Sequence, residues 1–135
     1  MVVARRRQAP QVLRVTCMLT DQVGDAVYIR GQANGYYKVA RADVGLYSKM
    51  PAIGILIQKW GFTDALVQLW GEIKNIYTGL SPGRTYFIDS AGRPTLVPPD
   101  PATTGGRAYL QVIGVALDVG VLLVKPAENL SIRVS

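Results

Sequence analysis

The sequence lacks histidine altogether and contains a single cysteine, Cys17. Without histidine the chain lacks the base that most serine and cysteine hydrolases use, and zinc sites of the ordinary His and Cys types are excluded. One cysteine cannot form an internal disulfide, so the stability of the fold has to come from packing or assembly. Cys17 lies in an apolar stretch, where we expect it to be a small core residue.

Charged residues and long hydrophobic runs are also scarce. Charged residues make up only 18% of the 135 residues, against 49% apolar residues. A chain so poor in charge and rich in Val, Tyr, Gly and Pro indicates a single all-β domain, with some surface covered by partners. No apolar run approaches the roughly 20 residues needed to span a bilayer, so we expect no membrane partner.

The few charges are unevenly distributed. The formal net charge is +6, and the positive excess lies mainly toward the N-terminus, where three arginines are consecutive. This balance permits binding to nucleic acid, to an acidic protein or to a membrane surface without choosing among them. We interpret residues 1–20 as an N-terminal arm that is ordered only against a partner, and residues 21–135 as a β-barrel domain. The candidate partner-binding residues of the arm are Arg5, Arg6, Arg7, Val12 and Arg14.

The arm has two open interpretations. Its arginines are either a solvated tail or a group that docks on an acidic partner or on phosphates. Residues 11–20 alternate partly between apolar and polar, which predicts a strand added to the edge of a sheet.

Turn signals recur every 8–12 residues or so along the rest of the chain, which favours a small sandwich or barrel. The predicted strands cover residues 26–30, 36–40, 52–57, 65–73, 107–117, 121–124 and 129–134. Asn34-Gly35 is the strongest hairpin signal, and residues 52–57 form an apolar run that predicts a central strand.

The most legible stretch is residues 79–98. Ser81-Pro82-Gly83 has the chemistry of a turn, and residues 85–88 and 95–97 predict a short hairpin that ends at two prolines. Gly79 to Gly83 also matches G-x-S-x-G, but a nucleophile elbow requires a helix after the serine, and here a β run follows. We therefore interpret Ser81 as a turn residue and expect no enzymatic activity.

Other candidate sites are weak. Asp21 and Asp25 fall in one turn, but a hard cation requires six or more oxygen ligands, so we expect no metal and no cofactor. Tyr28, Tyr36 and Tyr37 accompany cations on a predicted hairpin, an arrangement that can stack bases. Tyrosines on small β domains also lie at the edge of the core, with the ring buried and the hydroxyl exposed to solvent.

The order of several motifs resembles a small β domain of tailed-bacteriophage virion proteins. The motifs are VGDAVYI (23–29), PAIGILI (51–57), VQLWGEI (67–73), GLSPGRTYFIDSAGRPT (79–95) and LQVIGVALDVGVLLVKP (110–126). The resemblance covers about residues 21–126 and implies a β-barrel or β-tulip fold with a non-enzymatic, structural role.

A short copy of this domain with an arm is most similar to a capsid decoration, or cement, protein. The resemblance implies a trimer made in the host cytoplasm and bound to the major capsid protein on the outer surface of the head, which it stabilises by bridging capsid subunits. One alternative is a tail, baseplate or fibre module. A second is a nucleic-acid-binding β-barrel, although we expect no sequence-specific nucleic-acid partner.

Overall fold

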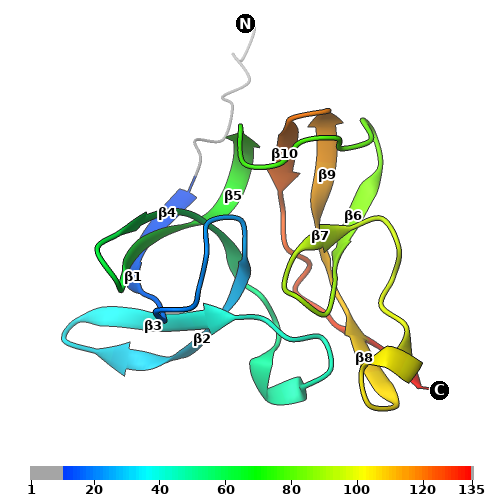
Figure 1. The fold of residues 1–135 in the computed structure, drawn as a ribbon, viewed down its shortest axis with the longest axis horizontal. Coiled ribbons are helices and arrows are strands. Elements are labelled where there is room, and N and C mark those ends of the chain that lie inside the picture. Colours follow the sequence, from blue (N-terminus) through cyan, green and yellow to red (C-terminus); the bar gives the residue numbers. More distant parts are fainter. Residues whose placement is uncertain (1–10, 135) are drawn as a thin grey trace, which may run out of the picture.

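A computed structural model describes residues 11–134. The chain is almost entirely β-structure, as expected from its composition (Figure 1). The strands are β1 (Gln11–Thr16), β2 (Ala26–Ala33), β3 (Tyr36–Arg41), β4 (Gly54–Trp60), β5 (Asp64–Lys74), β6 (Thr85–Ile88), β7 (Pro94–Thr95), β8 (Arg107–Leu110), β9 (Val112–Asp118), β10 (Val121–Val124) and β11 (Ser131–Val134). Two short 3₁₀ turns, η1 (Tyr47–Lys49) and η2 (Pro101–Thr103), interrupt the loops.

Strands β1 to β5 form a barrel. They are hydrogen-bonded in the order β1-β3-β2-β4-β5, and β1 also pairs with β5, which closes the ring. β1 runs antiparallel to β5 along its whole length but pairs in parallel with β3 only at Val15 and Thr16. The ring is therefore closed by β3 at one end of β1, whereas the first half of β1 has β5 as its strand partner.

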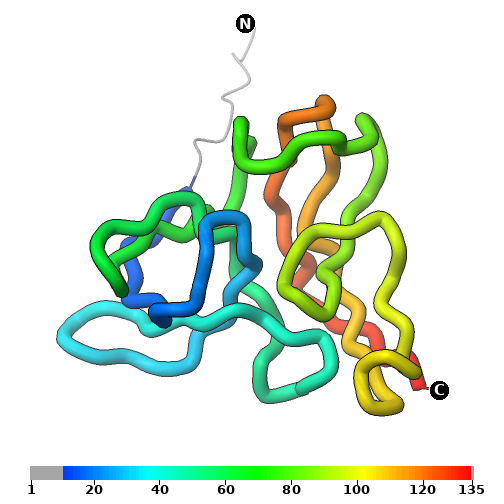
Figure 2. The backbone as a smooth tube through the Cα atoms, viewed as in Figure 1, coloured from blue at the N-terminus to red at the C-terminus, as the bar shows by residue number. Residues whose placement is uncertain are grey.

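β5 is the element shared by the two halves of the molecule. Residues Asp64–Gln68 pair with β4, and residues Gly71–Lys74 pair with β10. β10 continues the sheet through β9 and β6 to β7, while β8 and β11 form a separate two-stranded sheet. Figure 2 shows the consequence, with the barrel on one side of β5 and the later strands on the other.

Each half has its own hydrophobic core. The barrel core consists of Val15, Cys17, Val27, Val39, Leu56, Ala65 and Val67. The second core is larger and draws on β4, β6, β9 and β10; its fully buried members include Ile55, Ile88, Ile113, Leu122 and Val124. Consecutive residues of β4, Ile55 and Leu56, face different cores, because side chains alternate across a strand.

Most of the strands expected from the sequence are present. The Asn34-Gly35 hairpin is confirmed, and both residues have the positive φ values, 55° and 81°, that a tight hairpin turn of this kind requires. The central strand is confirmed by Ile55, which is 0% exposed. The hairpin of residues 79–98 is found as β6 and β7, although the return strand is only Pro94–Thr95.

The expected boundary between arm and body is wrong for residues 11–17. β1 was expected to lie in an arm of residues 1–20, but it is a full member of the barrel, and Val15 and Cys17 are each only 1% exposed. The physical reason is the alternation of Leu13, Val15 and Cys17, which supplies apolar side chains that the barrel core buries. The remainder of the predicted arm, residues 1–10, lies outside the described residues.

Candidate interaction surface

Two of the residues predicted to bind a partner lie together on the outer wall of the barrel. Val12 and Arg14 point to the same side of β1, opposite to Leu13 and Val15, and Val12 is 50% exposed. The guanidinium carbon of Arg14 lies 5.6 Å from the ring centre of Tyr36 and 5.9 Å from that of Trp60. We call Val12, Arg14, Tyr36 and Trp60 the barrel-wall patch.

Different strands build the barrel-wall patch. β1 supplies Val12 and Arg14, β3 begins with Tyr36, and β4 ends with Trp60. Both aromatic side chains remain 41–43% exposed, and Phe62 in the following turn is 77% exposed. Arginine, tyrosine and tryptophan are the residue types that dominate the energetics of protein interfaces. Arg5, Arg6 and Arg7, the other predicted partner-binding residues, lie outside the described part of the chain.

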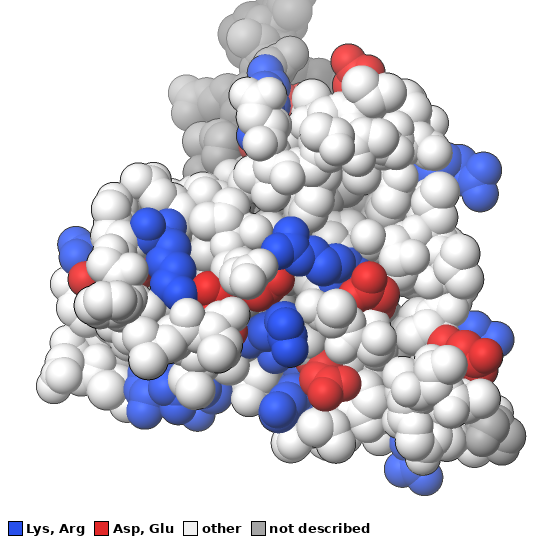
Figure 3. All heavy atoms as spheres, in the orientation of Figure 1, with Lys and Arg blue, Asp and Glu red and all other residues white. Residues whose placement is uncertain are grey.

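The three tyrosines considered for base stacking are not arranged as one platform. Tyr36 contacts Arg14, whereas Tyr37 follows it directly in β3 and so points to the opposite face of the strand. Tyr28 is half-buried in β2. On the face shown in Figure 3, Lys and Arg are spread over several elements with Asp and Glu among them, rather than gathered into one basic patch.

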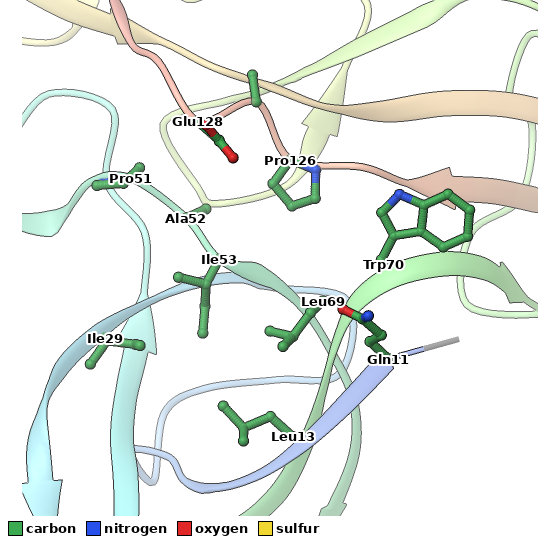
Figure 4. A pocket seen from close by; sticks show the side chains of 11 residues that line it. Gln11, Leu13, Ile29, Pro51, Ala52, Ile53, Leu69, Trp70, Pro126 and Glu128 are labelled. Atoms are coloured by element: carbon green, nitrogen blue, oxygen red, sulfur yellow. The ribbon is translucent and has the colours of Figure 1, made fainter. Parts of the chain in front are cut away.

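A second feature is an open apolar hollow of about 500 Å³ at the mouth of the barrel (Figure 4). It is lined by Gln11, Leu13, Ile29, Pro51, Ala52, Ile53, Leu69, Trp70, Pro126, Ala127 and Glu128. Leu13, Ile53 and Leu69 also pack on the barrel core, so the floor of the hollow is the outer layer of that core. We call this feature the barrel-mouth hollow.

A buried glutamine fixes two walls of the barrel-mouth hollow. Gln111 is 1% exposed; its Oε1 accepts a hydrogen bond from the Ala52 N–H at 2.8 Å. Its Nε2 donates to the carbonyl oxygens of Ala52 and Ala127, both at 2.9 Å. These contacts join the segment before β4 to the segment after β10, and Ala52 and Ala127 both line the hollow; we call this set of hydrogen bonds the Gln111 clamp. Sequence reasoning missed Gln111, because its partners lie far away along the chain.

The carboxylates of Asp21 and Asp25 organise the turn in which they lie. Asp21 accepts hydrogen bonds from the backbone N–H groups of Met18, at 2.7 Å, and Arg41, at 3.1 Å. Asp25 accepts one from the Gln22 N–H and forms an ion pair with Arg93 at 3.1 Å. Burial raises the pKa of Asp25 above its ordinary value, although the Arg93 guanidinium acts in the opposite direction.

One positive group, the amino group of Lys59, binds the backbone carbonyls of the turn around Asp21. The Nζ of Lys59 donates hydrogen bonds to the carbonyl oxygens of Met18, Leu19 and Asp21. Within residues 11–134 no group of three or more acidic, Cys or His side chains is arranged to hold a metal ion.

Ser81 and Cys17 are placed as the sequence indicated. Ser81 lies in the turn before β6, its backbone N–H donates to the hydroxyl of Tyr86 at 2.8 Å, and a strand rather than a helix follows. Cys17 is buried in the barrel core, where burial raises the pKa of its thiol. None of the helical segments in the described residues has the length and apolar character required to cross a membrane.

Comparison with known proteins found no matching family model, no matching curated protein and no matching solved structure.

Proposed function

We propose that this chain is a structural virion protein, a capsid decoration protein of a tailed bacteriophage. In this proposal it binds the outer surface of the head, contacts the major capsid protein and bridges neighbouring capsid subunits. The proposal is supported by the resemblance of motifs between residues 23 and 126 to virion β domains. The observation that carries it is the barrel-wall patch, which offers an arginine and two aromatic rings on a rigid sheet.

The chemistry of the patch suits a protein partner with acidic and apolar groups. The two rings and Val12 offer apolar area, while the guanidinium of Arg14 supplies donors for a carboxylate. Because Arg14 is held over both rings, little side-chain freedom remains to be lost on binding.

A binding assay with undecorated capsids tests the proposal. Capsids are mixed with wild type, Val12→Asp or Val119→Asp and then pelleted. Val119 is the matched control, because it is 57% exposed in the turn between β9 and β10, away from the patch. We expect Val12→Asp to lose most of its capsid occupancy, since it introduces a desolvated charge into the contact, and Val119→Asp to keep it.

Equal occupancy for both variants would mean that the barrel-wall patch is not the attachment surface. Labelling intact virions and locating the protein by electron microscopy separates a head protein from the alternative, a tail, baseplate or fibre module. Analytical ultracentrifugation tests the proposed trimer.

A second candidate, a nucleic-acid-binding barrel, is favoured by one contact, the guanidinium of Arg14 over two exposed aromatic rings. In that case Tyr36→Ala should abolish binding to single-stranded oligonucleotides near physiological salt, whereas Tyr37→Ala, on the opposite face of β3, should not. For a decoration protein we expect weak binding to duplex DNA that falls by about 0.9 log units per log unit of salt for each phosphate neutralised.

A further inference from the structure

We propose that the barrel-mouth hollow is the docking site of the chain's own residues 2–4, the sequence Val-Val-Ala. These residues lie outside the described part of the chain, and the inference rests on the hollow and on the sequence that leads to it. It does not depend on the proposed function, which uses the barrel-wall patch on the opposite side of β1.

Connectivity is the first argument. The described chain begins at Gln11, and the side chain of Gln11 itself lines the barrel-mouth hollow. Residues 5–10 link Gln11 to the Val-Val-Ala sequence, and six residues span at most about 20 Å. Because Gln11 itself lines the hollow, residues 2–4 have to travel back only a short distance to reach it, and a linker of this length is long enough for the chain to reverse direction. So short a tether keeps the segment at an effective concentration of about millimolar or above.

Chemical complementarity is the second argument. The floor of the hollow is formed by Leu13, Ile29, Ile53 and Leu69, and these side chains converge on the open space in Figure 4. Valine and alanine side chains match such a floor, because docking removes apolar surface of both the segment and the hollow from water.

Charge gives a third, independent argument. Glu128 is the one charged residue that lines the hollow, it is exposed, and within residues 11–134 it has no ion-pair partner. Three arginines, Arg5 to Arg7, directly follow the apolar residues in the sequence. An apolar floor with a carboxylate at its rim therefore matches an apolar segment followed by guanidinium groups.

Other occupants fit less well. A volume of about 500 Å³ lies in the range of small-ligand pockets, but such pockets also present several convergent polar groups. Here Gln11 and Glu128 are the only lining side chains with polar ends apart from the indole of Trp70. A segment from a second copy has the same chemistry but lacks the advantage of the tether.

Trp70 is a built-in probe, because its indole lies at the rim of the hollow (Figure 4). In the full chain, Trp60→Phe leaves Trp70 as the single tryptophan. Val3→Asp in this background tests docking, and Gln8→Asp is the matched control with the same change in charge outside the docking residues.

With Val3→Asp we expect the Trp70 emission to shift to longer wavelength and acrylamide quenching to increase, because water replaces the segment. The Gln8→Asp chain should keep the parent spectrum, and a chain lacking residues 1–4 should match Val3→Asp. Far-UV circular dichroism confirms that each variant keeps the β body folded.

Three results would overturn the proposal. One is an unchanged Trp70 signal in Val3→Asp. Another is the same shift in Gln8→Asp, which would assign the effect to charge alone. The third is a parent signal that changes on about hundredfold dilution, which would indicate a second copy as the occupant. All three results are measured without capsids. Failure of the docking proposal can therefore be told apart from failure of the proposed function, which is tested by capsid binding.

Discussion

At the scale of single residues, the buried polar side chains are the positions where a substitution should change the stability of this protein most. Gln111 and Asp25 are both almost fully buried, yet they serve different purposes. Gln111 satisfies backbone groups of two distant segments, whereas Asp25 carries a charge that burial disfavours. A buried polar group contributes little when satisfied, but leaving its partners unsatisfied is costly.

Replacing Gln111 by leucine should therefore destabilise the protein strongly. The change leaves the Ala52 N–H and the carbonyl groups of Ala52 and Ala127 without their side-chain partner. At about 1–3 kcal/mol for each buried unsatisfied group, we expect a loss of about 3 kcal/mol or more in the free energy of unfolding. Denaturant unfolding measures it, with Gln58→Leu, on the exposed side of β4, as the control. A loss no greater than that of the control would contradict the clamp.

The raised pKa of Asp25 predicts a pH dependence of defined sign. Because the folded protein binds this proton more tightly than the unfolded chain does, the contribution of Asp25 to stability falls as the pH rises from its ordinary pKa, 3.8, to its raised value. Asp25→Asn removes this titration. The stability of wild type relative to Asp25→Asn should thus decrease with rising pH across that window, as measured by unfolding at several pH values. An increase would mean that the ion pair with Arg93 outweighs burial.

At the scale of elements, local signals in the sequence are sufficient to predict the hairpins but do not predict which distant strands pair with each other. Asn34-Gly35 and the turn of residues 89–92, between β6 and β7, act through backbone conformation, which neighbouring residues determine, and both hairpins are predicted by the sequence. The pairing of β1 with β5 joins segments far apart in sequence, so alternation placed residues 11–20 in a strand but not in the barrel.

The candidate site was predictable to a similar extent. Val12 and Arg14 are singled out by the sequence, and the structure places them on one side of β1 with Arg14 over the ring of Tyr36. Trp60 and the barrel-mouth hollow were not predicted, because they depend on how β4 and the segment after Pro126 fold back onto β1.

Close contact between β4 and β5 leads to a prediction about Gly54. A Cβ added to Gly54 would overlap with the carbonyl oxygen of Gln68, a backbone atom that cannot move without separating the strands. Gly54→Ala should lower the free energy of unfolding by about 1–3 kcal/mol or more. Gly120→Ala is the control, because the nearest atom to its Cβ is 3.7 Å away, and thermal unfolding compares the two. Equal melting temperatures would mean that β4 and β5 can move apart at little cost.

At the scale of the whole molecule, the shared strand β5 joins two hydrophobic cores into one body. Val67 of β5 belongs to the barrel core, whereas Ile73 of the same strand belongs to the second core. Unfolding either half would remove pairing partners from β5, so the halves should not unfold independently.

We therefore expect a single cooperative unfolding transition. Leu56→Ala in the barrel core and Ile113→Ala in the second core should each lower the stability of that transition by about 2–5 kcal/mol. Tryptophan fluorescence reports on the barrel, where Trp60 and Trp70 lie, and far-UV circular dichroism reports on all strands. If Leu56→Ala shifted only the fluorescence transition, the two halves would be independent.

The pairing of β1 with β5 also has a consequence for synthesis on the ribosome. At about 5–20 residues per second, several seconds pass between the emergence of Thr16 and that of Asp64, so nascent β1 waits without its main partner. The local hairpins β2–β3 and β4–β5 can form before β1 is paired, which makes β1 the last of the five barrel strands to join the barrel. During that wait Arg14 interrupts the apolar run Val12-Leu13 and Val15, and a charge at such a position suppresses aggregation of an unpaired strand.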